Sequence, residues 1–106
     1  MARSLGLTSL TILAALEHRR CYGLDLVDRT GLLEGTVYTT LRRMEKKGLV
    51  EGLWEDPAIA EDERRPRRRY YTLLPEGARA LERGRAKVQW ITAGAIDGVA
   101  GGEPSG

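Results

Sequence analysis

The sequence of 106 residues contains only one cysteine, Cys21, and one histidine, His18. A single cysteine cannot form a disulfide within the chain, and these two side chains cannot complete a four-ligand zinc site by themselves. No further residue completes a catalytic triad around them. We therefore expect neither a disulfide scaffold, nor a metal or cofactor site, nor an enzyme.

Long apolar runs are also absent. No stretch approaches the roughly 20 consecutive apolar residues that cross a membrane, and the N-terminus lacks a long apolar segment followed by a small-residue cleavage site. We expect a cytoplasmic protein without a membrane partner. The length suits one domain, because domains commonly have ~100 to 200 residues. Hydrophobic residues make up 42% and charged residues 30%, which excludes a disordered chain of low hydrophobicity.

The net charge is only +2, but the charges are segregated along the chain. Two clusters of opposite sign follow one another. The acidic cluster consists of Glu55, Asp56, Glu61, Asp62 and Glu63, and the basic cluster of Arg64, Arg65, Arg67, Arg68 and Arg69. A charge block is most often a solvated loop, so the neighbouring elements must decide its role.

The first predicted helix runs from about Ser4 to His18, with Ser4 as its N-cap. At 100° per residue, Leu5, Ile12, Leu13 and Leu16 share one face. Leu7 and Leu10 fall on nearly the opposite side. The core of so small a domain covers one of these faces, and a second copy of the chain is the natural cover for the other.

Two further helices are predicted over residues 22–30 and 35–48, separated at Gly31, which tolerates the positive φ of a helix end. In the second of them, Val37, Leu41 and Met44 form a buried stripe. The reverse side carries Thr36, Thr39, Arg43, Lys46 and Lys47. Tyr38, Thr40 and Arg42 are expected on its flanks.

Residues 49–55 and 69–74 alternate like half-buried strands, with Tyr71 on the core side, and the charged clusters occupy the loop between them. Pro75 then begins a last helix with the apolar seam Leu81, Val88, Ile91, Ala95 and Val99. We expect residues 1–74 to form the main unit, 75–100 a dimerisation helix of the same compact domain, and 101–106 a flexible tail.

This order of elements predicts an α+β, mainly α fold: a winged helix-turn-helix with a C-terminal dimerisation helix. In that architecture the third helix enters the DNA major groove and the hairpin contacts the flanking backbone or minor groove. The expected DNA-binding residues are Thr36, Tyr38, Thr39, Thr40, Arg42, Arg43, Lys47, Arg64, Arg65, Arg67 and Arg68. The expected dimer interface comprises Leu7, Leu10, Val88, Ile91 and Ala95.

Several motifs resemble the PadR family of prokaryotic transcriptional regulators. The similar stretches are Tyr22-Gly23-Leu24-Asp25-Leu26, Thr30-Gly31-Leu32, Gly35-Thr36-Val37-Tyr38, residues 41–50, Trp54, residues 65–73 and Glu76-Gly77. Departures occur at Leu33 and Glu34, where the family usually has a Ser cap, at Thr39, where Pro is frequent, and at Arg64, which replaces a usual Gly. The last helix is similar to that of the short, single-helix subgroup, which has no separate ligand domain.

The resemblance implies a homodimer formed by the first and last helices, with wing arginines on double-stranded DNA. It implies a repressor that commonly acts on its own or adjacent genes and is sometimes released by a small molecule. Some relatives stack planar effectors between tryptophans of the last helix, which gives Trp90 a candidate effector role. Packing in the interface is the interpretation of Trp90 that we favour, and we expect Trp54 to be packed as well.

Two rival functions belong to other classes. The first is a protein-interaction module that keeps the winged-helix scaffold and binds a partner through the last helix and the acidic loop. The outward cations of the third helix argue against it. The second is a small enzyme or sensor based on Cys21, for which a lone thiol gives little support, because such residues usually behave as small hydrophobes.

Overall fold

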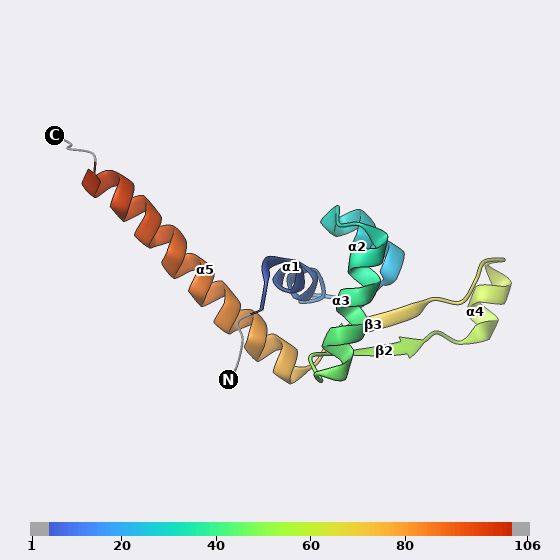
Figure 1. Cartoon of the computed structure of the whole chain (residues 1–106). Helices are drawn as coiled ribbons and strands as arrows, with labels where there is room; N and C mark the ends of the chain where they lie inside the picture. The colour runs from blue at the N-terminus through green and yellow to red at the C-terminus, as the bar shows by residue number, and fades with distance from the viewer. Residues whose placement is uncertain (1–4, 103–106) are drawn as a thin grey trace.

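The computed structural model describes residues 5–102, with side chains for residues 5–94. The molecule is elongated, with principal extents of 66 × 29 × 23 Å. Three helices and a small sheet form its centre, while the C-terminal helix and the hairpin tip project at opposite ends (Figure 1). The elements are α1 (Leu7–Ala15), β1 (Cys21–Tyr22), α2 (Gly23–Thr30), α3 (Glu34–Lys46), β2 (Val50–Trp54), α4 (Pro57–Asp62), β3 (Arg69–Leu73) and α5 (Pro75–Gly102).

Helix α1 is shorter than the sequence predicts. It begins at Leu7, with Gly6 as an extended N-cap residue that makes no side-chain cap bond, and it ends at Ala15. The expected cap at Ser4 is therefore wrong for this helix start, and Ser4 itself lies outside the described residues. The apolar segregation holds, because Ile12 and Leu13 are fully buried while Leu7 is 71% exposed.

The α2–turn–α3 unit agrees closely with the prediction. Gly31 ends α2 with a φ of 74°, and Gly48 follows α3 with a φ of 73°, both in the region that glycine adopts at little cost. The N-cap of α3 is Leu33, which supplies no side-chain cap bond. The Thr30 hydroxyl accepts a hydrogen bond from the Leu32 amide at 3.2 Å and so helps to fix the turn.

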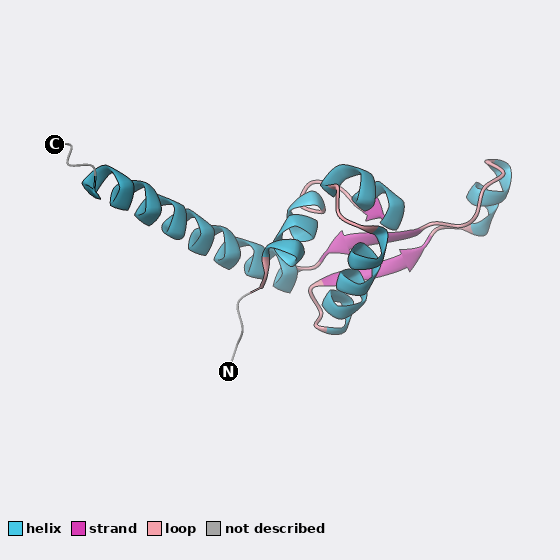
Figure 2. Cartoon of the chain, turned by 45° about the horizontal axis from the view of Figure 1, so that its top comes forward, coloured by secondary structure: helices cyan, strands magenta, loops and turns pink. Residues whose placement is uncertain are grey.

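The strands form an antiparallel sheet in the order β1-β3-β2 (Figure 2). Leu53 pairs with Tyr70 and Trp54 with Arg69, as the expected hairpin requires. The sequence pattern did not reveal β1, because two residues are too few to show alternation. It also missed α4, where the Asp56 carboxylate accepts a hydrogen bond from the Ala58 amide at 2.9 Å and Pro57 occupies the first turn.

One hydrophobic core joins the helices to the sheet. It includes the predicted α3 stripe, and Tyr71 is buried as expected. Its deeply buried members include Ile12, Leu13, Cys21, Leu26, Val37, Leu41, Met44, Val50 and Leu81. Because this stripe anchors α3, the orientation of the opposite face of the helix is fixed, and that face points to solvent.

Helix α5 packs its first turns on the body and then leaves it (Figure 1). Leu81 is 2% exposed, whereas Val88 and Ile91 in the same predicted seam are exposed. The helix continues to Gly102, two residues beyond the expected end, and residues 103–106 of the predicted tail lie outside the described part. Among the described residues, no helix combines the length and apolar character needed to cross a membrane.

Candidate nucleic-acid interface

The solvent face of α3 presents hydroxyl groups and cations. Thr39, Arg42 and Arg43 are exposed, and Thr36 is half-buried. A shallow hollow of about 440 Å³ lies over the N-terminal half of the helix. Its lining residues are Leu33, Gly35, Thr36, Thr39, Thr40 and Arg43. Donors and methyl groups at a helix N-terminal half are the groups that reach base edges when such a helix lies in a major groove.

Thr40 is not on the exposed flank where the sequence placed it. The residue is only 4% exposed and lies at the floor of the hollow. Thr40 lies three residues after Val37 and four before Met44, so its position falls on the buried side of the helix. Thr40 can shape the hollow, but its side chain has almost no surface for direct contact.

Tyr38 lies on the side of α3 nearest α2. Its ring covers Gly23, where a Cβ would collide with the ring and hydroxyl of the tyrosine. Burial raises the pKa of the Tyr38 hydroxyl, and the nearby Glu34 carboxylate adds to this shift. The residue remains 37% exposed. The ring and the hydroxyl of Tyr38 thus both pack over Gly23, while part of the side chain remains in contact with solvent.

Among the described side chains, the cations of α3 have no acidic partners. Within residues 5–94, no carboxylate forms an ion pair with Arg42, Arg43, Lys46 or Lys47. By contrast, Glu45 on the same helix pairs with Arg69 of β3 at 2.7 Å. The positive charge on the outer face is therefore not neutralised by any carboxylate of the described side chains. Such a surface attracts polyanions through phosphate contacts.

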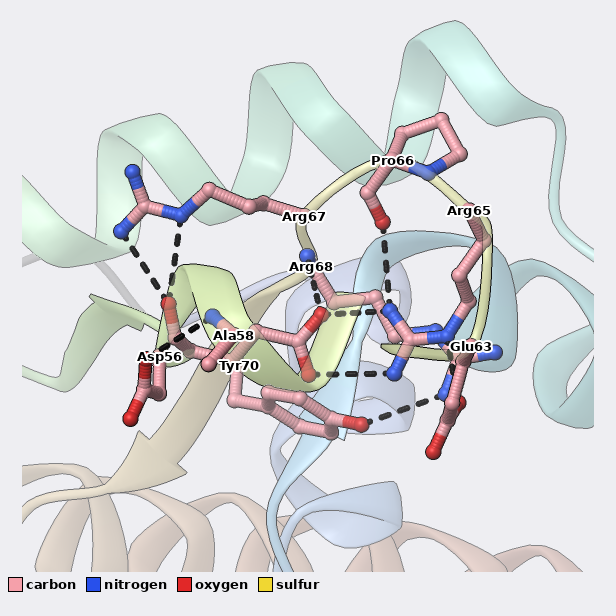
Figure 3. Close-up of polar contacts among 9 residues, drawn as sticks. Asp56, Ala58, Glu63, Arg65, Pro66, Arg67, Arg68 and Tyr70 are labelled. Carbon is pink, nitrogen blue, oxygen red and sulfur yellow. Dashed lines mark hydrogen bonds and ion pairs between the residues drawn. The ribbon is translucent and has the colours of Figure 1, made fainter. Parts of the chain in front are cut away.

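Glu55, directly after β2, organises the arginine-rich return to β3. The side chains of Arg65 and Arg67, labelled in Figure 3, both turn toward it. Its buried carboxylate pairs with Arg65 through both oxygens and accepts a hydrogen bond from the Arg68 amide at 2.9 Å. Its carbonyl oxygen accepts bonds from Arg67 Nε at 3.2 Å and Nη2 at 3.1 Å. We call this arrangement of Glu55, Arg65, Arg67 and Arg68 the Glu55 clasp. It closes the base of the segment that carries α4.

The clasp changes the expected roles of the arginines. Hydrogen bonding from Arg65 lowers the pKa of the Glu55 carboxyl to about 2, so this group is charged at neutral pH. Arg65 also donates from Nε to Glu63 at 2.7 Å. Arg65, one of the expected DNA contacts, is therefore held by Glu55 and Glu63, and its side chain is only 18% exposed. The sequence pattern did not reveal this role of Glu55, since nothing in an acidic run distinguishes the carboxylate that turns inward.

The remaining arginines of the wing differ in their exposure and in the groups that their side chains bind. Arg64 is exposed, forms no ion pair among the described residues, and has a positive φ of 54°. Arg67 is exposed while its guanidinium is bound to the Glu55 carbonyl. Arg68 lies 4.0 Å above the Tyr22 ring and donates to the Tyr70 hydroxyl at 3.4 Å. Arg64 and Arg67 are the most accessible.

Trp54 was expected to be packed, but the structure leaves it largely exposed. The side chain lies at the end of β2 and is 56% exposed. Guanidinium groups flank its ring: Arg67 at 5.5 Å and Arg69 at 5.6 Å from the ring centroid. The core ends before this position, although Trp54 lies on the same strand face as Val50. A sequence pattern shows which face a residue is on, but not where the covering layer ends.

A second surface lies between α1 and α5. A groove of about 470 Å³ is lined by Leu7, Leu10, Thr11, Ala14, Leu81, Arg85, Val88 and Gln89. The side chain of Ala95, which was also assigned to the interface, lies outside the described residues. Trp90 is 76% exposed and stands nine residues from Leu81, which corresponds to the opposite side of an α-helix. It does not line the groove.

Cys21 and His18 do not form a site. Cys21 is fully buried and its thiol donates weakly to the Ala15 carbonyl at 3.7 Å, while the side chain of His18 is exposed. Burial raises the pKa of the Cys21 thiol, which opposes formation of a reactive thiolate. Among the described residues, no cluster of three His, Cys, Asp or Glu side chains could hold a metal ion.

Comparison with known proteins agrees with this geometry. The model of the transcriptional regulator PadR-like family matches residues 12–83. A PadR family transcription regulator from Clostridium difficile R20291 is 29% identical, with a TM-score of 0.77, over 87% of this chain and 97% of that one. The protein smu.1704 from Streptococcus mutans UA159 is 25% identical, with a TM-score of 0.71, over 96% and 95% of the two chains.

A third similar structure is BpsR from Bordetella bronchiseptica, described in work on the regulation of its DNA binding by 6-hydroxynicotinic acid. It is 26% identical, with a TM-score of 0.69, over 85% of this chain and 60% of that one. A search of curated proteins finds no match. The family match covers most of the chain and includes both α3 and the arginine-rich hairpin. The chain therefore belongs to the PadR-like family of DNA-binding transcriptional regulators.

Proposed function

We propose that this protein is a homodimeric repressor that binds an inverted-repeat operator through α3 and the β2–β3 wing. The observation that carries the proposal is the uncompensated positive face of α3. Arg42, Arg43, Lys46 and Lys47 have no acidic partner within residues 5–94, beside a hollow lined by threonines. Cations that bind phosphates position a protein on DNA, whereas hydroxyl and methyl groups read base edges.

The roles divide along the surface. Thr36, Thr39 and Arg43 are proposed to read bases, with the Tyr38 hydroxyl, Arg42 and Lys47 on phosphates. In the wing, Arg64, Arg67 and Arg68 are proposed to contact the backbone or minor groove. We propose that Arg65 and Thr40 support the DNA-binding surface without contacting DNA. Arg65 is bound to Glu55, and Thr40 is only 4% exposed.

The dimer is proposed from the exposed apolar groove of α1 and α5. Leu7, Leu10, Val88 and Ile91, together with Ala95, would be covered by the same surface of a second copy. A symmetric dimer matches two half-sites about one helical turn apart, ~10 base pairs or a multiple of it. A regulator of a prokaryotic chromosome acts in the cytoplasm, which we propose as its location.

Release by a small molecule is part of the proposal. The BpsR relative is described as regulated in its DNA binding by 6-hydroxynicotinic acid, and this chain is 26% identical to it. Trp90 is the candidate effector contact here, since its side chain is 76% exposed in the single chain. The effector would bind between Trp90 and groups of the second copy.

The experiment is a DNase footprint on the DNA upstream of the protein's own gene, followed by site selection from a random DNA pool. A protected inverted repeat is expected. The Thr39→Ala variant should change the preferred base at one position of both half-sites, by roughly 1 kcal/mol per disrupted pair, with non-specific binding nearly intact. Wild type and variant selecting the same site at equal relative affinity would remove Thr39 from base recognition.

The alternative of a protein-interaction module on the same scaffold makes a different prediction. Such a protein would need no unneutralised cations on α3, and its binding to DNA would be weak and independent of sequence. The footprint therefore separates the two functions directly.

A further inference from the structure

The tryptophan at the end of β2 lies beyond the hydrophobic core. A large aromatic ring in solvent forfeits the free energy of burial, yet Trp54 is 56% exposed. Its only ring contacts of the cation–π kind within the described chain are the two guanidinium groups of Arg67 and Arg69. The position thus combines an aromatic surface with two positive charges.

These charges are held in place from the protein side. The Glu55 carbonyl accepts two hydrogen bonds from Arg67. Arg69 is bound to Glu45 of α3 at 2.7 Å. Both guanidinium groups are therefore fixed beside Trp54 before any ligand arrives. Preorganised side chains lose less conformational entropy on binding.

The same contacts show which way this face of the wing points. The Arg69–Glu45 pair ties it to the side of α3 that carries Arg42, because residues 42 and 45 are neighbours on a helix. Arg42 is exposed and unpaired within residues 5–94. Trp54 and its arginines are consequently continuous with the positive surface of α3. Leu53, by contrast, points to the other face of the sheet, because successive strand residues alternate.

We propose that Trp54 is a DNA contact of the wing, with its ring packed against the deoxyribose-phosphate backbone beside the bases reached by α3. Arg67 and Arg69 present their free N–H groups to the phosphates on either side of the ring. The occupant is double-stranded DNA, and the proposal rests on the DNA-binding function proposed above. It adds a contact that is neither a cation nor a base-reading group.

The two tryptophans of the chain allow a direct test. Trp54 is in the wing and Trp90 in α5, so Trp90→Phe leaves a single reporter at the wing and Trp54→Phe leaves one in the last helix. Each variant is titrated with duplex carrying the footprinted operator. DNA binding is followed independently by the anisotropy of a fluorophore on the DNA. We expect the emission of the Trp90→Phe protein to change in step with anisotropy, and that of the Trp54→Phe protein to stay constant.

Affinity supplies the second measurement. Trp54→Ala should weaken operator binding about tenfold, within the range that aromatic contacts to nucleic acids contribute. Leu53→Ala is the matched control, because Leu53 is equally exposed but lies on the opposite strand face, and it should bind like wild type. Circular dichroism confirms that each variant is folded.

The outcomes separate the two proposals. No anisotropy change with any DNA would overturn the DNA-binding function itself. Normal binding by Trp54→Ala, with unchanged Trp54 emission during binding, would overturn the wing contact alone. Equally weakened binding by Trp54→Ala and Leu53→Ala would also overturn it, since this would show a general effect on the hairpin.

Discussion

At the scale of single residues, Arg64 carries a visible conformational strain. It is the one non-glycine residue with positive φ that the described chain contains, at 54°, and the family resemblance expects Gly at this position. We predict that Arg64→Gly raises the free energy of unfolding by roughly 0.5–1 kcal/mol, because a side chain with a Cβ is disfavoured in this region. Urea denaturation measures the change.

Arg64→Ala is the control for that prediction, because it removes the same charge and keeps the Cβ. It should show no stabilisation. Both variants should bind DNA with equally reduced affinity if Arg64 contributes only its charge. A stability of Arg64→Gly below that of Arg64→Ala would contradict the assigned strain.

Glu55 is the residue for which pH dependence can be predicted. Its pKa lies near 2 in the folded protein, against an ordinary value of 4.5, because Arg65 donates to the carboxylate. A lowered folded-state pKa stabilises the fold above the unfolded pKa, and this stabilisation is lost as the pH falls toward the folded one. The difference in unfolding free energy between wild type and Glu55→Gln should therefore be largest above about pH 5 and shrink toward pH 2.

Urea denaturation at a series of pH values tests this. Other carboxyls with lowered pKa, such as Glu17 and Glu76, are present in both proteins and cancel in the difference. A constant difference across the acidic range would show that the Glu55 carboxylate does not gain its stability from charge.

At the scale of elements, the wing separates supporting from contacting arginines. We predict that Arg67→Ala reduces the magnitude of the log–log salt slope of DNA binding by about 0.9 for each phosphate that is no longer bound, doubled in a symmetric dimer. Arg65→Ala should leave the slope close to that of wild type but lower the stability, since it strands the buried Glu55 carboxylate. Binding measured from low to moderate salt distinguishes the two. Equal salt slopes for both variants would contradict the assignment of Arg65 to structural support and of Arg67 to phosphate contact.

The elements also show how far the sequence could be interpreted. Periodicity located α2, α3, β2, β3 and the start of α5, because each has a buried stripe that continues for several residues. It failed for β1, which is short, and for α4, where Asp56 and Pro57 start a helix within a charged stretch. The observed α1 begins at Leu7, three residues after the expected cap at Ser4, and ends at Ala15, three residues before the predicted end at His18.

The candidate site shows a similar limit. The outer face of α3 follows from the position of its core stripe, so Thr39 and Arg43 were placed correctly on the exposed side. The sequence alone does not show which acceptor each arginine binds. Arg65 and Arg67 are separated by one proline, yet Arg65 binds the Glu55 carboxylate and Arg67 binds the Glu55 backbone carbonyl. These hydrogen-bond partners depend on distances between side chains in the folded protein.

At the scale of the whole molecule, α5 continues well past the core that its first turns complete (Figure 1). Ile91 is 51% exposed in the single chain, and the groove between α1 and α5 has leucine, alanine and valine side chains on its walls together with Thr11, Arg85 and Gln89. We predict that Ile91→Glu dissociates the proposed dimer, because burying an unpaired charge in the interface costs more than the interface gains there. The fold of each monomer should survive, since the residue contacts solvent in the isolated chain. Sedimentation at micromolar concentration measures the change in mass.

Ala93→Glu is the matched control, because Ala93 is exposed and lies 200° around the helix from Ile91, using 100° per residue. It introduces the same charge into α5 and should remain dimeric. Because each half-site of an inverted repeat needs its own α3, monomeric Ile91→Glu should bind a full operator no more tightly than an isolated half-site. A wild-type protein that sediments as a monomer, or an Ile91→Glu protein that stays dimeric, would show that this face is not the interface.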